Sequence, residues 1–156
     1  MKLKTTEELI EEFGVPNEKG TYLTTITLPY PMRLAWDLNI TVSKMRCHKK
    51  VADAFTAVFN DLLATYSFKV LHELEIDVFG GCFVYRKMRG GSQLSRHSWG
   101  IAIDLNPTKN DLKTPFDKSQ FAQPIYKSLF MIFEKHGFVN YGKEKGYDTM
   151  HFEYAL

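Results

Sequence analysis

The stretch that decides the fold lies in the second half of the chain, at residues 95–104. It reads Ser95-Arg96-His97-Ser98-Trp99-Gly100-Ile101-Ala102-Ile103-Asp104. A histidine and an aspartate stand seven residues apart, on either side of a glycine. Asp104 falls inside an apolar run that ends at Asn106-Pro107, where an ionised carboxylate is costly unless it is paired or bound to a metal. The stretch therefore predicts a buried strand that carries a carboxylate, with an imidazole just before it.

A second segment near the C-terminus has similar chemistry. Residues 148–153 read Asp148-Thr149-Met150-His151-Phe152-Glu153. The two segments together offer two imidazoles and one carboxylate, with a spare acid. Catalytic zinc favours three N/O protein ligands and a fourth position for water, whose proton a nearby carboxylate can take. By spacing alone, however, the pattern is more simply explained by ordinary buried and hydrogen-bonded histidines.

Short apolar patterns bounded by Gly and Pro predict the remaining elements. Thr5 and Glu8 have the spacing of a capping box, which predicts the start of a helix. The residues Pro29-Tyr30-Pro31 are expected to end the strand that precedes them. The expected helices are 5–13, 51–63 and 124–136, and the expected strands are 22–28, 77–81, 82–85, 100–105 and 150–154.

Helices come early in this order and short strands cluster in the second half. The fold class is therefore α+β, with a small, mostly antiparallel sheet flanked by helices. The chain has 156 residues and no linker-like segment, so one domain is expected over residues 1–156. The motif-bearing core of that domain is about 75–156, and residues 1–74 form an N-terminal elaboration.

Composition excludes several classes of protein. A net charge of +2 gives no electrostatic reason to expect a nucleic-acid partner, and no apolar run is long enough to cross a bilayer. Acidic residues interrupt the apolar residues of the N-terminus, so no signal peptide is expected and the chain is predicted to fold in the cytoplasm. Cys47 and Cys82 lack metal-site or disulfide-framework spacing and are expected to be buried, reduced thiols.

The two motifs resemble a known family. Ser95-x-His97-x-x-Gly100-x-Ala102-x-Asp104, followed by Asp148-x-x-His151, is similar to the zinc D-alanyl-D-alanine carboxypeptidase and L-alanyl-D-glutamate endopeptidase family. That family includes vancomycin-resistance D,D-peptidases and phage endolysins and shares its fold with the Hedgehog signalling domain. The resemblance is specific over residues 80–154, looser over 22–70 and absent from the first twenty residues.

The resemblance implies a role for each motif residue. His97, Asp104 and His151 would be the Zn²⁺ ligands, and Asp148 would be the general base. An aspartate at that position is usual in the endopeptidase branch, whereas carboxypeptidases usually carry glutamate.

Three further residues are implied upstream of, or within, the first motif. An arginine would stabilise the oxyanion, and Arg86 is the best match, with Arg89 as its competitor. Ser95 would lie near the substrate.

Other polar residues have simpler interpretations. Glu153 shares a strand face with His151 and is interpreted as its partner or as an alternative base. His136 is expected to cap a helix end, where an imidazolium favours the helix dipole. His48 lies in the basic stretch 44–50, interpreted as a solvated helix face. Asp77 is expected in a solvated turn.

His72 has no partner pattern. Trp99 lies either in the cleft or in the core, and Arg96 is either a surface charge or a substrate contact.

The resemblance implies a zinc peptidoglycan peptidase, most simply an endopeptidase of the phage-lysin type that stays in the cytoplasm until release and then acts on the wall. The implied partner is the wall peptide, with neither nucleic acid nor membrane, and a monomer is favoured. Two alternatives stay open: a D-alanyl-D-alanine carboxypeptidase or dipeptidase with the same ligands, and a non-catalytic zinc-containing binding module.

Overall fold

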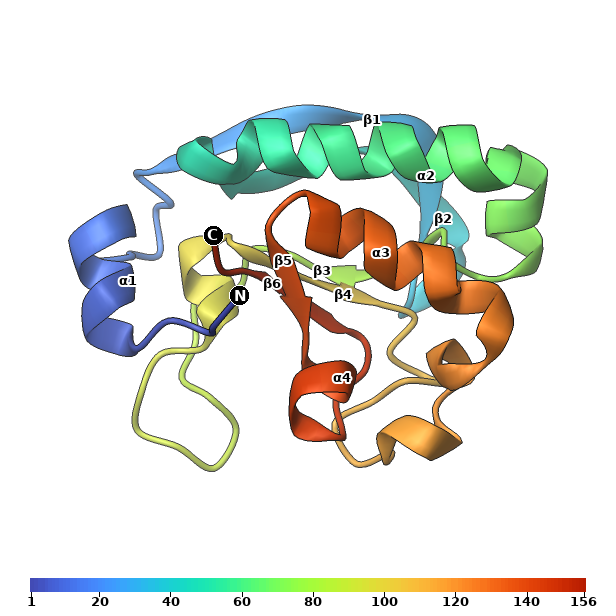
Figure 1. Cartoon of the computed structure of the whole chain (residues 1–156). Coiled ribbons are helices and arrows are strands. Elements are labelled where there is room, and N and C mark those ends of the chain that lie inside the picture. The colour runs from blue at the N-terminus through green and yellow to red at the C-terminus, as the bar shows by residue number, and fades with distance from the viewer.

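A computed structural model describes all of residues 1–156, and its centre is one six-stranded sheet (Figure 1). The strand order is β2-β1-β3-β4-β6-β5. The strands are β1 (Leu23–Leu34), β2 (Asp37–His48), β3 (Val78–Gly81), β4 (Ala102–Leu105), β5 (Phe138–Asn140) and β6 (His151–Tyr154). The helices are α1 (Thr6–Phe13), α2 (Ala52–Glu73), α3 (Lys127–Lys135) and α4 (Tyr141–Lys145).

The α+β class is confirmed, but the sheet is larger than predicted and is mixed. β3 pairs with β1 in parallel, whereas the other neighbouring strands are antiparallel. Helix α2, which is interrupted by a kink at Ser67 (φ +64°), connects the β1–β2 hairpin to β3 and acts as the crossover that a parallel pair requires. The sequence pattern did not reveal this crossover because α2 was expected to end ten residues earlier.

The prediction that Pro29-Tyr30-Pro31 ends the first strand is wrong. β1 continues to Leu34, and the side chains at every second position, including Leu28 and Tyr30, stay buried. The register between β1 and β2 shifts between Thr27 and Met32, which is where both prolines lie. Proline lacks an N–H, so it is tolerated where a bulge interrupts the ladder.

The basic stretch at residues 44–50 is also not a helix face. Most of it forms the end of β2, in which Met45 and Cys47 are buried while Lys44 and Arg46 are exposed. That two-residue alternation is typical of a strand with one buried face.

The strand predicted at residues 82–85 is absent from the structure. β3 ends at Gly81, whose φ of +120° is rarely adopted by other residues, and the chain then turns away from the sheet. The carbonyl group of Cys82 is thereby free of the sheet ladder and points to the motif described below.

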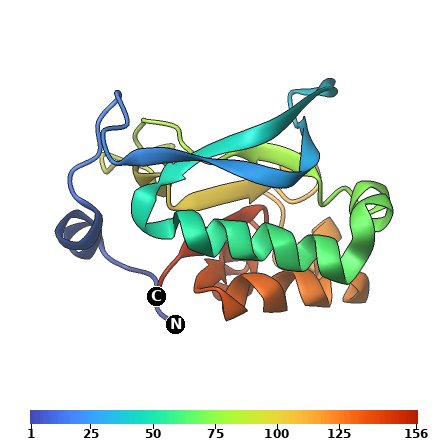
Figure 2. The same ribbon diagram turned by 90° about the horizontal axis from the view of Figure 1, so that it is seen from above.

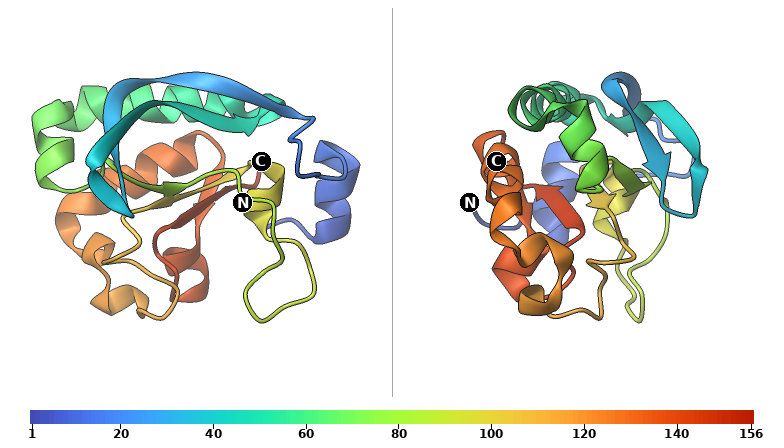
Figure 3. Two further views of the ribbon diagram at one scale, coloured as in Figure 1. Left: turned by 180° about the vertical axis from the view of Figure 1, so that it is seen from behind. Right: turned by 90° about the vertical axis from the view of Figure 1, so that its right-hand side faces the viewer.

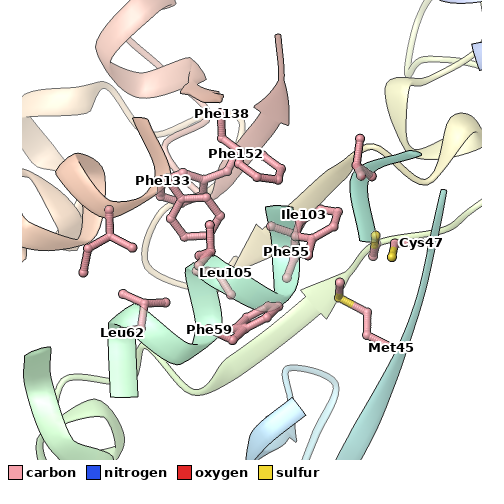
Figure 4. Close-up of a cluster of buried hydrophobic side chains, with 14 of the residues drawn as sticks. Met45, Cys47, Phe55, Phe59, Leu62, Ile103, Leu105, Phe133, Phe138 and Phe152 are labelled. Carbon is pink, nitrogen blue, oxygen red and sulfur yellow. The ribbon is translucent and has the colours of Figure 1, made fainter. Parts of the chain in front are cut away.

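Helices α2 and α3 cover one face of the sheet (Figure 2). The centre of a cluster of 28 buried apolar residues lies between them and the strands, and Figure 4 draws part of this cluster. Its members come from the N-terminal half as well as from the motif-bearing half: Phe55 of α2 lies 4.7 Å from Phe138, and Phe133 of α3 stacks on Phe152 at 4.1 Å between ring centroids. Residues 1–74 therefore share one core with the strands that carry the motifs.

Both cysteines are buried and free, as predicted. Burial raises the pKa of Cys47 to about 12 and raises that of Cys82 well above its ordinary value. Both side chains are therefore protonated thiols at neutral pH, with little nucleophilic character.

The two chain ends lie side by side (Figure 3). The Lys4 ammonium donates a hydrogen bond of 2.8 Å to the carbonyl oxygen of Leu156. Helix α1 begins with the capping box that the sequence predicted at Thr5 and Glu8. None of the helices has both the length and the apolar character to span a membrane.

Candidate metal centre

The first motif folds into a single tight turn. His97 lies in a 3₁₀ helix, Arg96–Trp99, which begins where the Ser95 hydroxyl accepts a hydrogen bond from the His97 N–H. Gly100 ends the turn with a φ of +71°, and its N–H donates to the His97 carbonyl. A Cβ atom at Gly100 would lie 2.8 Å from the Leu23 side chain and 3.0 Å from the His48 backbone nitrogen. Glycine is therefore required here both by backbone angle and by space.

We expect Gly100→Ala to lower the free energy of unfolding by about 2 kcal/mol or more, since a left-handed alanine costs about 1–2 kcal/mol and the contact with the β2 backbone adds to it. Urea titration followed by circular dichroism measures this change. Gly90→Ala is the matched control, because Gly90 has a similar φ of +73° with no atom near its Cβ position. Equal losses in the two variants would contradict the steric argument.

The second motif meets the first across two paired strands. Asp104 of β4 stands directly opposite His151 of β6. The Nδ1 atom of His151 lies 3.1 Å from Asp104 Oδ1, and the Nε2 atom of His97 lies 3.2 Å from Asp104 Oδ2. One nitrogen or oxygen atom from each of the three residues lies within 4.8 Å of the others, and all three side chains are buried. The structure thus brings together the three residues predicted to be ligands.

The outer nitrogen of each histidine has its own partner. His97 Nδ1–H donates to the Cys82 carbonyl oxygen at 2.8 Å, and His151 Nε2–H donates to Glu153 Oε1 at 3.1 Å. These bonds direct His97 Nε2 and His151 Nδ1 toward Asp104. Metal-binding histidines almost always have such an outer partner, which fixes the ring and its tautomer.

The electrostatics suit a site for a cation. Burial alone would raise the pKa of Asp104, but the adjacent His97 and His151 imidazoles hold it well below its usual range. Burial would lower the pKa of His151, but hydrogen bonds to Asp104 and Glu153 raise it to about 10. The surroundings thus favour positive charge at the centre, and a zinc ion would replace the proton on His151 Nδ1. Two imidazoles and one carboxylate are a donor set that fits catalytic zinc.

Asp148 lines the same cavity, which has a volume of about 270 Å³. Its Oδ1 atom is buried without a hydrogen-bond partner, and burial raises the pKa of this carboxyl group. Its φ of +61° is uncommon for a residue other than glycine. Backbone strain of this kind is often found at functional sites. The predicted base therefore lies in the wall of the cavity with one acceptor atom that has no partner.

Both candidate arginines line the cavity, and they differ in how the backbone holds them. The Arg86 N–H donates to the Ser98 hydroxyl, and the Arg86 carbonyl accepts from the Ser95 N–H at 2.8 Å. Arg89 is exposed and precedes the Gly90-Gly91 turn. The hydrogen-bonded backbone at residue 86 favours Arg86 over Arg89 as the candidate for stabilising the oxyanion. Ser95 also lines the cavity, although its hydroxyl is the cap of the His97 turn.

Several sequence interpretations of other polar residues are wrong. His48 is buried, and its Nε2–H donates to the Phe13 carbonyl oxygen at 3.0 Å. Asp77 is only 1% exposed and accepts hydrogen bonds from Arg33 and from His72 Nδ1. His72 therefore has a partner five residues away, which its own sequence neighbourhood did not indicate.

Other interpretations agree with the structure. His136 does lie at the C-terminal end of α3, where its Nε2 atom also contacts Asp61 at 2.7 Å. Trp99 is a buried core residue whose indole N–H donates to the Gly14 carbonyl. Glu153 is fully buried against His151.

The cavity also contains residues that the motifs did not identify. Tyr141 and Lys145 of α4 line it, with the Lys145 ammonium 3.8 Å from the centre of the Tyr141 ring. They belong to no motif. They come to the site because α4 follows β5 in the chain and leads into β6, the strand that carries His151. The Cys82 carbonyl is a backbone group, so no residue pattern could have indicated it.

Comparison with known proteins agrees with the geometry. Residues 89–154 match the family model described as D-alanyl-D-alanine carboxypeptidase. This stretch contains His97, Asp104, Asp148 and His151, and it begins after Arg86. The match supports the resemblance to zinc D,D-peptidases. The chain matched neither a curated protein nor a solved structure.

Proposed function

We propose that this protein is a zinc-dependent peptidoglycan peptidase that hydrolyses an amide bond of the wall peptide, as an L-alanyl-D-glutamate-type endopeptidase. One observation carries the proposal. His97, Asp104 and His151 converge around one point of a cavity that also contains a buried, unpartnered carboxylate at Asp148. The match of residues 89–154 to the carboxypeptidase family model supports the same chemistry.

The zinc ion would be held by His97 Nε2, His151 Nδ1 and a carboxylate oxygen of Asp104. Zinc bound in this way lowers the pKa of water and polarises a carbonyl group. Asp148 removes the proton from the attacking water and later delivers it to the leaving amine, for which its raised pKa is suited. Arg86 donates hydrogen bonds to the oxygen that becomes negatively charged.

The cavity is suited to an acidic peptide. Its lining includes Arg86, Arg89 and Lys145, whose charges attract carboxylates, and the exposed apolar side chains Met88 and Tyr147. Wall peptides carry carboxylates on D-glutamate and at their C-terminus. An aspartate at position 148 favours the endopeptidase, and in that case we propose that the protein is a phage-type lysin acting as a monomer.

Incubation of the purified protein with isolated cell walls tests the proposal. We expect new free amino groups to appear in proportion to enzyme and to vanish when a chelator is present, with recovery on addition of Zn²⁺. Mass spectrometry of the released fragments should show new N-terminal D-glutamate. Walls that release no amino groups with the zinc-loaded protein would contradict the proposal.

The family description favours one alternative, a D-alanyl-D-alanine carboxypeptidase with the same residues. In that case the same fragments would lose single D-alanine residues and keep their L-alanyl-D-glutamate bond. Tight binding to walls without any hydrolysis would instead indicate a non-catalytic zinc module.

A further inference from the structure

Glu153 is a buried carboxylate that the proposed chemistry does not use. It is 0% exposed, and it lies two residues after His151 on the same face of β6. Its Oε1 atom accepts two hydrogen bonds, from His151 Nε2–H at 3.1 Å and from the Tyr141 hydroxyl at 2.7 Å. Its Oε2 atom has no hydrogen-bond partner, and the Arg96 Nε atom lies 3.8 Å away. An ionised carboxylate that is buried in this way is costly unless its contacts offset the loss of hydration.

The position of Glu153 excludes it as an alternative base. It is absent from the residues that line the cavity. It contacts the nitrogen of His151 that faces away from Asp104, so the imidazole separates it from the centre. Its carboxylate therefore has no route to the water or the substrate, and what it can act on is the histidine ring.

Two neighbours keep Glu153 in this position. The Tyr141 ring lies 4.0 Å from the His151 ring, so α4 holds the imidazole and its carboxylate partner from the same side. Arg96 is fixed by the N-terminal segment, because its guanidinium donates to the Lys4 carbonyl at 3.1 Å and to the Thr6 hydroxyl at 3.2 Å. The residues with no family resemblance thus hold the cation that faces Glu153.

We propose that Glu153 is a positioning residue that holds His151 with Nδ1 directed at the metal, and that Tyr141 and Arg96 hold Glu153 in turn. This inference rests on the proposed function, since it requires a metal at the His97–Asp104–His151 centre. Outer carboxylates of metal-binding histidines fix the tautomer and increase the basicity of the ligating nitrogen.

The test measures zinc affinity of the metal-free protein by competition with a chromophoric chelator, so it does not depend on activity. Loss of such an outer partner typically weakens metal binding about 10–100-fold. We expect that loss for Glu153→Leu, and a smaller loss, under about tenfold, for Glu153→Gln, which keeps an acceptor for Nε2–H. We also expect Co²⁺ absorption bands to shift in both variants.

Asp77→Leu is the matched control. Asp77 is a buried carboxylate with a histidine and an arginine as partners, but it lies in a separate cluster with Arg33 and His72. We expect this variant to lose stability while its zinc affinity and Co²⁺ bands stay as in the wild type. A general effect of removing a buried carboxylate would instead weaken metal binding in both variants and would overturn the inference.

The outcomes separate this inference from the proposed function. Wild-type protein that binds no zinc would overturn both. Wild-type protein that binds zinc, with unchanged affinity and unchanged Co²⁺ bands in the Glu153 variants, would overturn the positioning role alone. If Glu153→Leu does not fold, Glu153→Gln and Tyr141→Phe decide the matter by the same two measurements.

Discussion

Replacement of His97 by alanine is expected to remove bound zinc and hydrolysis together. Two protein ligands would remain, and a catalytic zinc site usually needs three. After dialysis, metal analysis should fall from about one zinc ion per chain to below about a tenth, and release of amino groups from walls should reach background. The change is expected to leave the fold intact because His97 lies in a turn beside the core and not within a strand.

His136→Ala provides the control for this experiment. That histidine ends α3 and contacts Asp61, away from the cavity. The control should keep its zinc and its activity. Full zinc occupancy in His97→Ala would show that the ion binds elsewhere and would contradict the ligand assignment.

Replacement of Asp148 by asparagine is expected to preserve zinc binding and to lower kcat by about 10²–10⁴, the range that a positioned general base contributes. Asparagine has nearly the same shape but cannot take a proton at neutral pH. It also tolerates a positive φ, whereas alanine at +61° would add a backbone cost to the loss of the carboxylate. Rates measured at saturating substrate, together with metal analysis, give both quantities.

Glu144→Gln is a suitable control because Glu144 is an exposed acid of the nearby helix α4. It should have the kcat and the zinc content of the wild type. Near-normal hydrolysis by Asp148→Asn would remove the base role from Asp148. Loss of zinc in that variant would make Asp148 a ligand instead.

The sequence was most informative where function restricts local geometry. Asp104 could be placed in a buried strand, with His97 just before it, because an apolar run and a Pro-terminated end mark that strand; the tight turn that holds His97 was not predicted. His151 could be associated with them through the resemblance, and the structure shows that it lies opposite Asp104. Gly100, a position of the first motif, is the glycine whose missing side chain lets the end of β2 approach.

The sequence was least informative where the partner lies far along the chain. Asp77 was expected in a solvated turn, but Arg33, 44 residues away, and His72 compensate its burial. β1 continues through two prolines because the register with β2 shifts at this point, so the ladder is interrupted and no N–H is needed from them. The length of α2 depends on packing against the sheet, which the apolar spacing of residues 51–63 did not reveal in full. Local patterns contain no information on such long-range compensation.

Diffraction from crystals of the zinc-loaded protein, with anomalous data collected at the zinc absorption edge, tests the central claim most directly. We predict one anomalous peak within about 2.0–2.2 Å of His97 Nε2, His151 Nδ1 and an Asp104 carboxylate oxygen, with water at the fourth position. A peak at other residues, or a fourth protein atom in place of that water, would contradict the account.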